Sequence, residues 1–348
     1  MALTYKEMFD TFNALSKTKD YIDSNWTEIE ALFRSKDRFV YVGCGSSYSN
    51  AKSFAMICAM GAGKSVMALA AGDILLHAER YIKCLDGAAI VFISRSGRTS
   101  ELILALDALK KQGCDVAVAS LVCADDTPLG EKSDLVLSTP WAFDESVCQT
   151  RCVTNAFFMA AYIGAKIVGD TDVLEDLSLI IKEGPAYLER AESLAKELAT
   201  EPWTHAVVLA DAELEGIAEE GALVFKEVCQ LPSSYHHLLD VRHGPMVLIG
   251  KETLVIVALG KSNELELSLL KDLNAKGATV IAFSDVPAPL AGTAELEGIR
   301  NTSFGKPLSH VAKGIPFIIL NQMIAYYKSK ETGADPDKPT GLDPWISL

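Results

Sequence analysis

Short apolar runs and helical patterns alternate along the whole chain. The apolar runs form one series at residues 39–43, 88–94, 115–122 and 134–140, and a second series at residues 205–210, 252–260, 279–285 and 297–304. The second series repeats the spacing of the first at an offset of about 165 residues, which indicates a duplicated domain.

Helical patterns fill the gaps between these predicted strands. In the first half, Leu102, Leu106 and Leu109 share one helical face, and Gly113 stands just past the end of that helix. Strands that are almost continuously apolar and alternate with helices indicate a parallel sheet covered on both faces. We therefore predict the α/β fold class, with two tandem doubly wound, flavodoxin-like parallel-sheet domains and flanking helices.

The regions outside the repeat define the expected domain organisation. The tail contains Pro336, Pro339 and Pro344, so we expect it to be extended rather than helical. We predict N-terminal helices at residues 1–36, a first, phosphate-binding domain at 37–172, a linker helix at 173–200, a second domain at 201–332 and the tail at 333–348.

A serine-rich loop at residues 94–99 carries the strongest chemical signal. It follows an apolar strand and opens a helix, so it lies at the edge of the sheet where ligands bind in open α/β folds. Ser94, Ser96 and Thr99 offer hydroxyls beside unpaired helix N–H groups, and Gly97 allows a close turn. Helix capping by one residue is the simpler interpretation, but it does not account for three hydroxyls around a glycine. The loop predicts a phosphate site.

A second loop, Gly-Cys-Gly-Ser-Ser at residues 43–47, also follows a strand and opens a helix. Both loops are expected at the same edge of the first sheet. The equivalent place in the second half reads Leu-Gly-Lys-Ser-Asn at residues 259–263 and does not repeat the serine-rich loop. We therefore expect one half to bind phosphate and the other to supply a different function.

The charge balance excludes several classes of partner. The chain has 46 acidic and 32 basic residues, a net charge of -14. A nucleic-acid binder needs basic surface, and an anionic membrane disfavours an acidic protein, so we expect neither partner. The N-terminus mixes acids and bases unlike a signal peptide, and the apolar stretch at 315–327 is too short to span a bilayer. These features predict a soluble, cytoplasmic protein.

Cysteine and histidine patterns give no sign of a metal or a cofactor. The eight cysteines include no C-x-x-C pair, and most lie in apolar segments, which is typical of buried free thiols in a reducing compartment. The six histidines include no H-E-x-x-H pattern. We predict that the protein needs no cofactor and holds no metal.

The two loops join further motifs whose order and spacing together are specific. They resemble the sugar isomerase (SIS) domain family, above all the isomerase half of glucosamine–fructose-6-phosphate aminotransferase, the fructosamine-6-phosphate deglycases and the amino-sugar-phosphate deaminases. The additional motifs are residues 145–150 (ESVCQT), 220–222 (EGA), 226–227 (KE), 242–245 (RHGP) and 335–339 (DPDKP).

The resemblance implies a phosphorylated sugar as substrate and assigns roles to individual residues. It implies Glu227 as the acid–base residue at the sugar C1–C2 and His243 as the partner that opens the ring or protonates an oxygen. Because this histidine loop commonly reaches into a neighbouring subunit in the family, it also implies a homodimer whose active sites are completed across the interface. The implied substrate-binding residues are Ser47, Ser94, Ser96 and Thr99 on the phosphate and Ser46, Arg95, Val147 and Gln149 along the sugar.

Three departures from the synthase pattern narrow the implied chemistry. No glutaminase region is present, no lysine follows Lys338 where the synthase has an imine-forming one, and Val224 stands where the synthase has another lysine. We therefore expect an aldose–ketose isomerase, deglycase or deaminase acting on an amino- or amine-conjugated hexose 6-phosphate, rather than a complete glutamine-dependent amidotransferase.

The residues themselves are compatible with proton transfer. Glu227 belongs to an apolar helix with Leu223 and Val224 one turn earlier, and an apolar wall raises a carboxyl pKa into a useful range. His243 lies in a glycine–proline loop, suited to a proton donor near neutral pH. The alternatives are that Glu227 pairs with Lys226 or faces water, and that His243 is an ordinary surface residue.

Two other functions remain as alternatives. A non-catalytic phosphosugar-binding regulatory module is one, although such regulators usually carry a DNA-binding helix-turn-helix for which residues 1–36 are too short and too acidic. A nucleotide-binding enzyme is the other, but no G-x-G-x-x-G follows the first strand.

Overall fold

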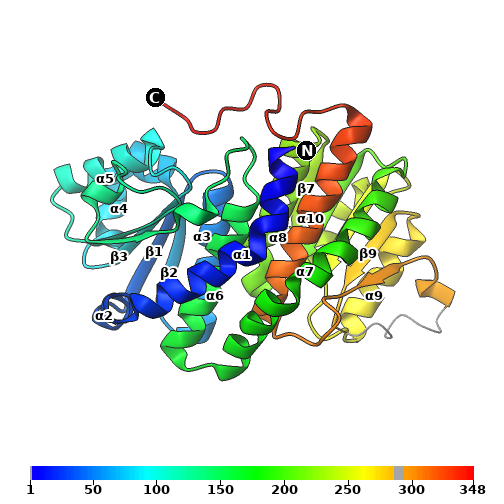
Figure 1. The fold of residues 1–348 in the computed structure, drawn as a ribbon, viewed down its shortest axis with the longest axis horizontal. Helices are drawn as coiled ribbons and strands as arrows, with labels where there is room; N and C mark the ends of the chain where they lie inside the picture. The colour runs from blue at the N-terminus through cyan, green and yellow to red at the C-terminus, as the bar shows by residue number, and fades with distance from the viewer. Residues whose placement is uncertain (1, 286–293) are drawn as a thin grey trace.

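Two parallel sheets of five strands each form the centre of the computed structural model, which describes residues 2–285 and 294–348 (Figure 1). The first sheet has the strand order β2-β1-β3-β4-β5. Its strands are β1 (Arg38–Gly43), β2 (Ser65–Ala70), β3 (Ala89–Ser94), β4 (Ala117–Val122) and β5 (Leu135–Ser138).

The second sheet repeats this topology. Its order, β10-β9-β8-β6-β7, is the first order read from the other end, and the described strand pairs are all parallel in both sheets. The prediction of two tandem doubly wound, flavodoxin-like domains is confirmed at the level of the fold. The strands are β6 (His205–Ala210), β7 (Ser233–His237), β8 (Thr253–Ala258), β9 (Thr279–Phe283) and β10 (Arg300–Thr302).

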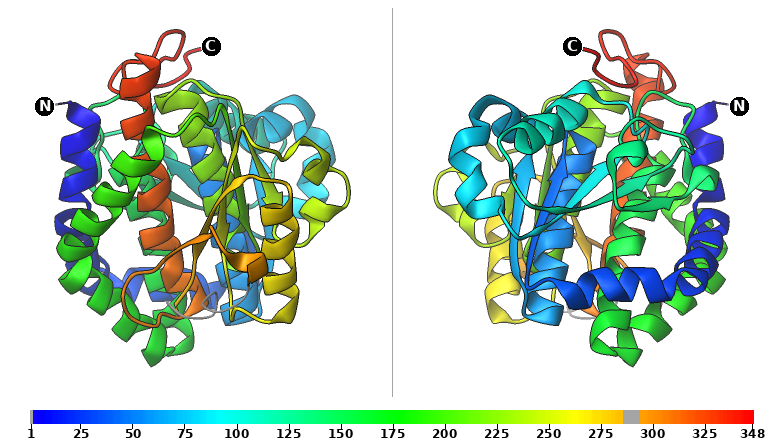
Figure 2. Two further views of the ribbon diagram at one scale, coloured as in Figure 1. Left: turned by 90° about the vertical axis from the view of Figure 1, so that its right-hand side faces the viewer. Right: turned by 90° about the vertical axis from the view of Figure 1, so that its left-hand side faces the viewer.

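Helices connect the strands and cover the sheets. A group formed by α1, α6, α7 and α10 packs together on one side of the two sheets (Figures 1 and 2). The helices are α1 (Leu3–Ser24), α2 (Trp26–Ser35), α3 (Ser46–Ala62), α4 (Ala71–Leu85), α5 (Ser100–Lys111), α6 (Arg151–Val168), α7 (Thr171–Ala199), α8 (Glu215–Val228), α9 (Glu264–Ala275) and α10 (His310–Thr332).

The hydrophobic pattern did not reveal β2 and β7. Both are edge strands, and an edge strand lacks the continuous apolar run of a strand buried between two neighbours. In β2 the first four residues alternate between exposed and half-buried, and β7 reads Ser-Ser-Tyr-His-His with no buried residue. Both strands owe their place to backbone pairing with β1 and β6.

The two halves meet where α3 packs on α8. The Ile217 amide donates a hydrogen bond to Ser53 Oγ at 3.0 Å, and Lys52 pairs with Glu219 at 2.6 Å. A Cβ atom on Gly216 would lie 2.1 Å from the carbonyl oxygen of Ser49, so this close approach requires glycine. The packing directs the second half of α8 toward the loops of the first sheet.

The C-terminal tail returns to the N-terminus. The Asp337 carboxylate accepts hydrogen bonds from the Leu3 and Thr4 amides, both at 2.8 Å. Beyond this anchor the tail runs along the upper edge of Figure 1 from α10 toward α5, without helix or strand, as its prolines predict. The predicted segment boundaries stay predictions, and residues 1 and 286–293 within them lie outside the described residues.

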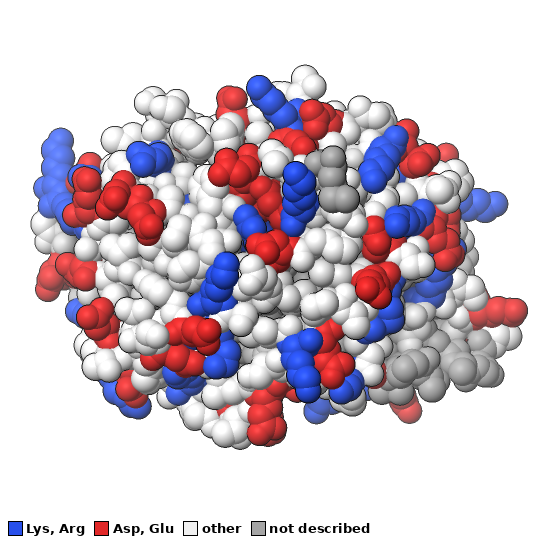
Figure 3. All heavy atoms as spheres, viewed as in Figure 1, with Lys and Arg blue, Asp and Glu red and all other residues white. Residues whose placement is uncertain are grey.

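The described residues contain neither a membrane-spanning helix nor a metal cluster. None of their helices is both long and apolar enough to cross a bilayer, and they contain no group of three or more His, Cys, Asp or Glu side chains suited to a metal ion. Acidic and basic side chains are interspersed over the face seen in Figure 3, without a continuous basic stripe. All eight cysteines are free thiols.

Candidate active site

The loops that follow β1 and β3 meet at the carboxyl edge of the first sheet. These two strands are neighbours, and the chain proceeds outward from them in opposite directions, to β2 on one side and β4 on the other. Such a reversal of strand order leaves a crevice in which open α/β sheets bind ligands. The N-termini of α3 and α5 both open into this place.

The loop between β3 and α5 is shaped by its serines and its glycine. Ser94 Oγ accepts a hydrogen bond from the Gly97 amide at 3.0 Å, and Ser96 Oγ accepts one from the Arg98 amide at 3.1 Å. Gly97 has φ +61°, and a Cβ there would lie 2.5 Å from Cβ of Thr127, so no other residue fits. Thr99 precedes the first turn of α5 but makes no side-chain cap. No side chain caps the start of α5, and its first amide, that of Ser100, donates to the Ile346 carbonyl at 3.2 Å.

The loop between β1 and α3 is equally tight. A Cβ on Gly43 would lie 2.3 Å from the backbone of Ser47, so the strand can turn directly into the helix only with glycine. Ser46 and Ser47 are buried at the first turn of α3, and the Ser47 amide donates to the Cys44 carbonyl at 3.1 Å. Two serines therefore stand at a second helix N-terminus beside the first.

Arg95 is buried and binds backbone carbonyls. Its Nη1 donates to the carbonyls of Ser146 at 2.7 Å and Val147 at 3.1 Å, and its Nη2 donates to that of Pro344 at 2.7 Å. The guanidinium also lies over the Phe143 ring, 5.7 Å from its centroid. Arg95 thus ties the β3 loop to the 143–150 segment and to the tail, a positioning role that its place in the motif did not reveal.

The 143–150 segment is held from three sides. Glu7 of α1 accepts hydrogen bonds from the amides of Glu145 at 2.6 Å and Ser146 at 3.1 Å. Buried Asp144 accepts one from the Thr150 amide at 2.8 Å. The Val147 amide donates to the Asp337 carbonyl at 2.9 Å, which joins the segment to the tail.

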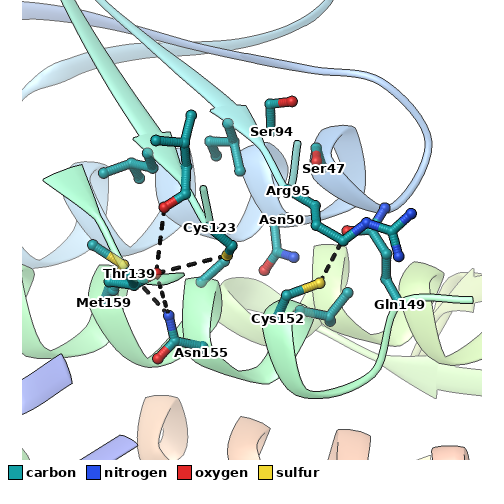
Figure 4. Close-up of a pocket in the computed structure, with 15 residues that line it drawn as sticks. Ser47, Asn50, Ser94, Arg95, Cys123, Thr139, Gln149, Cys152, Asn155 and Met159 are labelled. Atoms are coloured by element: carbon teal, nitrogen blue, oxygen red, sulfur yellow. Dashed lines mark hydrogen bonds between the residues drawn. The ribbon is translucent and has the colours of Figure 1, made fainter. Parts of the chain in front are cut away.

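A small cavity of about 20 Å³ lies beneath these loops (Figure 4). Four of the predicted substrate-binding residues line it, namely Ser47, Ser94, Arg95 and Gln149. Gln149 Oε1 accepts a hydrogen bond from the Cys152 thiol at 3.2 Å. A space of this size holds about one water molecule, so a hexose phosphate would lie above it.

Glu227 stands at the far end of α8, close to Arg95. Burial raises the pKa of its carboxyl to about 7, against the opposing effect of Arg95 and Lys226. Within the described part of the chain, no hydrogen bond or ion pair engages this carboxyl. A mostly buried carboxyl with a pKa near neutrality is suited to accept and return a proton.

Glu220 is a further buried carboxyl that the sequence analysis left without a role. It is 1% exposed, and its Oε2 has no hydrogen-bond partner among the described residues. Burial, and after it the charge of Glu227, raise the pKa of Glu220 well above its usual range, although a hydrogen bond from Ser46 opposes the shift. Its spacing of seven residues from Glu227 places both carboxyls on one face of α8, but the spacing alone does not indicate that Glu220 is buried.

His243 is not brought to this site within one chain. β7 pairs in parallel with β6, with His237 opposite Ala210 at the carboxyl end, whereas α8 leads away from that end to Glu227. His243 follows β7 by six residues, so it lies toward the other end of α8, a helix about 20 Å long. It is exposed, and the neighbouring Val247 and Leu248 are 80% and 74% exposed.

The tail reaches the mouth of the site. The Ser100 amide, the first of α5, donates to the Ile346 carbonyl at 3.2 Å, and the Leu348 amide donates to Ser100 Oγ at 3.1 Å. Together with the bond from Arg95 to Pro344, these contacts lay the last residues over the start of α5. Sequence reasoning did not predict them, because contacts between segments so far apart leave no local pattern.

Known proteins with a similar sequence support the family resemblance of this chain. Residues 32–163 match the SIS domain family. A glutamine–fructose-6-phosphate aminotransferase from Pyrobaculum aerophilum is 29% identical over 99% of this chain and 57% of its own length. The chain thus spans little more than half the length of the curated relatives it matches.

Solved structures share the fold over almost the whole chain. Glucosamine-6-phosphate deaminase from Thermotoga maritima has a TM-score of 0.79 at 24% identity, covering 100% of both chains. Tagatose-6-phosphate ketose/aldose isomerase from Escherichia coli has a TM-score of 0.83 at 21% identity, covering 99% of this chain and 97% of that one. The resemblance to the SIS family inferred from the sequence motifs is confirmed.

Proposed function

This chain carries a SIS domain, and we propose that it is an enzyme acting on an amino- or amine-conjugated hexose 6-phosphate by proton transfer between C1 and C2. The observation that carries the proposal is Glu227, a carboxyl without a hydrogen-bond or ion-pair partner among the described residues, with a pKa of about 7, beside two helix N-termini that present serines. Arg95 instead positions the loops by binding backbone carbonyls, and the other predicted site residues are proposed to keep the roles implied by their motifs.

The phosphate is expected to bind at the N-termini of α3 and α5. Backbone N–H groups and helix dipoles favour an anion there, and the serines supply additional donors. These local hydrogen-bond donors are needed because the chain as a whole has a net charge of -14, which repels a phosphate. Ser47, Ser94, Ser96 and Thr99 would hold the phosphate, and Ser46, Val147 and Gln149 would line the sugar.

Glu227 is the residue that would move the proton between C1 and C2. In a ketose aminated at C1, Glu227 takes a proton from C1 and returns it to C2, which leaves an imine at C1. Water hydrolyses that imine to an aldose 6-phosphate and a free amine. In an aldose aminated at C2 the proton moves from C2 to C1, and hydrolysis gives a ketose 6-phosphate and ammonia.

A second copy of the chain would complete the site. His243 lies at the opposite end of α8 from Glu227, on a segment with Val247 and Leu248 exposed. We propose a homodimer in which His243 of the partner subunit approaches Glu227 and assists ring opening. Light scattering measures the mass directly, and Val247→Asp with Leu248→Asp is expected to yield inactive monomers, whereas Leu76→Asp, at an exposed leucine elsewhere, should remain dimeric.

The test is incubation of the purified protein with hexose 6-phosphates aminated at C1 or C2, and with the unmodified sugars. Amine release and sugar interconversion are followed by mass spectrometry for the wild type, Glu227→Gln and the control Glu219→Gln on the same helix. Turnover of an aminated sugar by the wild type and the control only, reduced by about 10²- to 10⁴-fold in Glu227→Gln, would support the proposal. Binding without turnover would identify a phosphosugar-binding module instead.

A further inference from the structure

The second sheet repeats the loop geometry of the first at its own carboxyl edge. Gly45 after β1 has φ +53°, and Ala212 after β6 has φ +51°. Gly97 after β3 has φ +61°, and Ser262 after β8 has φ +54°. The left-handed turns therefore recur even where the glycine is absent, and β6 and β8 form a second switch point at which a doubly wound sheet binds ligands.

The chemical character of this second edge is inverted. In the first half, Gly45 is followed by Ser46 and Ser47, whose hydroxyls can donate hydrogen bonds. In the second half, Ala212 at the equivalent position lies between two carboxylates, Asp211 and Glu213. A cation already occupies the loop after β8, because Lys313 Nζ contacts the Gly260 carbonyl at 2.7 Å and Asp285 at 2.8 Å. The second edge attracts positive charge where the first attracts phosphate.

A cavity of about 210 Å³ opens beside Glu213. Apolar side chains from the ends of α3 and α6 and the start of α7, including Ile57, Ala161, Ala165 and Val173, form part of its walls, and Asp170 adds a carboxylate. A smaller, apolar pocket behind it shares Ile57 with this cavity. For comparison, a cavity of about 150 Å³ takes up benzene, so there is room for an apolar body of that size and a short polar arm.

The polar end of the cavity has unsatisfied acceptors. Glu213, Ser309 and His310 line it, and α10 begins there, at the lower edge of Figure 1. Ser309 Oγ is buried without a hydrogen-bond partner among the described residues. His310 Nε2 lies 3.4 Å from Asp211 and 4.0 Å from Glu213, so two carboxylates face a single imidazole. An ammonium group in the cavity would pair with the carboxylate of Glu213.

From these observations we propose that this cavity is a second ligand site, which binds a small primary amine with a compact apolar body, its ammonium on Glu213 and its apolar part between α3 and α6. The site does not depend on the reaction proposed above. It lies at the opposite end of α8 from Glu227 and shares no residue with that site.

Isothermal titration with benzylamine tests the proposal, with benzyl alcohol and benzoate as neutral and anionic analogues. Benzylamine is expected to bind at least about tenfold more tightly than either analogue. Glu213→Gln should weaken it by about tenfold, while Glu79→Gln, an exposed control, should not. Gly61→Leu should abolish binding by filling the cavity, because a Cβ at Gly61 meets no atom within 4 Å.

Gly72→Leu is the matched control for Gly61→Leu, since it is also helical with no atom within 4 Å of an added Cβ. Glu227→Gln should bind benzylamine like the wild type, which separates this site from the proposed reaction. Absence of heat with the wild type, equal affinity for benzoate, or unchanged binding in a folded Gly61→Leu variant would each overturn the proposal. Circular dichroism reports the folding of every variant.

Discussion

Glu220 and Glu227 lie seven residues apart on α8 and act on each other electrostatically across one face of the helix, toward the loops after β1 and β3. Glu220 is hydrogen-bonded by Ser46 of the first loop, and Glu227 lies within the field of Arg95 of the second. One helix of the second half therefore places two carboxyls beside the proposed phosphate site of the first half. Burial raises the pKa of both, and it raises that of the more deeply buried Glu220 further.

The pH dependence of turnover should report Glu227. Only the carboxylate form accepts a proton, and burial raises its pKa to about 7. We expect kcat/KM to fall by about tenfold per pH unit below that value and to level off above it, until a second group titrates. The measurement is kcat/KM from about pH 5 to about pH 9, and a flat profile across the acidic side would contradict the role of Glu227 as base.

Glu220→Gln should change the pH dependence of stability. Because its pKa is raised, Glu220 stays protonated in the folded protein at pH values where the unfolded chain has already ionised. Its contribution is complete below the unfolded pKa and is lost as pH rises toward the folded pKa. We expect urea midpoints of the wild type to decline more from about pH 5 to about pH 8 than those of Glu220→Gln. Glu219→Gln is the control, and an unchanged slope in Glu220→Gln would refute the assignment.

Gly97→Ala should damage both the fold and the phosphate loop. The added Cβ meets Thr127 at 2.5 Å in a backbone with φ +61°. We expect a loss of about 2–4 kcal/mol in the free energy of unfolding, together with weaker binding of inorganic phosphate. Gly113→Ala, with φ +75° and no atom within 4 Å, carries the backbone strain alone and should cost about 1 kcal/mol. Equal losses in the two variants would show that the contact with Thr127 is unimportant.

Lys313→Met should strongly destabilise the protein. The ammonium is 3% exposed and pairs with Asp285 at 2.8 Å, so its removal leaves a carboxylate and two carbonyls without their partner. We expect a loss of about 3–5 kcal/mol, partly recovered when Asp285→Asn is added. The control is Lys306→Met. The exposed ion pair between Lys306 and Glu183 should contribute less than about 1 kcal/mol to the free energy of unfolding. Similar losses in the two lysine variants would contradict this account.

The strand repeat, the fold class and the two loops were predictable because each depends on residues that are close together in the sequence. A buried parallel strand is an uninterrupted apolar run, and a loop that turns from strand to helix needs Gly43 or Gly97 at a fixed place. The edge strands β2 and β7 were not predicted because half-exposed strands have no uninterrupted apolar run. Their existence depends on a neighbour with which to pair.

The roles of Arg95 and Glu220 needed the assembled structure. The loop motif predicts an arginine near the sugar, but the carbonyls that Arg95 binds come from residues about 50 and 250 positions away. The burial of Glu220, which it shares with Glu7 and Glu266, is set by tertiary packing, here that of α8 against α3. The spacing of residues along the sequence indicates neither the burial of a side chain nor a hydrogen-bond partner far away in the chain.

The sequence by itself determined two doubly wound halves, and a serine-rich loop after β3 that the second half does not repeat, because periodicity and turn chemistry act over a few neighbouring residues. Only the tertiary structure decided that Glu227 reaches the first half while His243 stays at the other end of α8, and that the tail covers the start of α5. The reason is physical: close packing of α3 on α8 at Gly216 sets the relation between the halves, and that contact joins residues more than 160 positions apart.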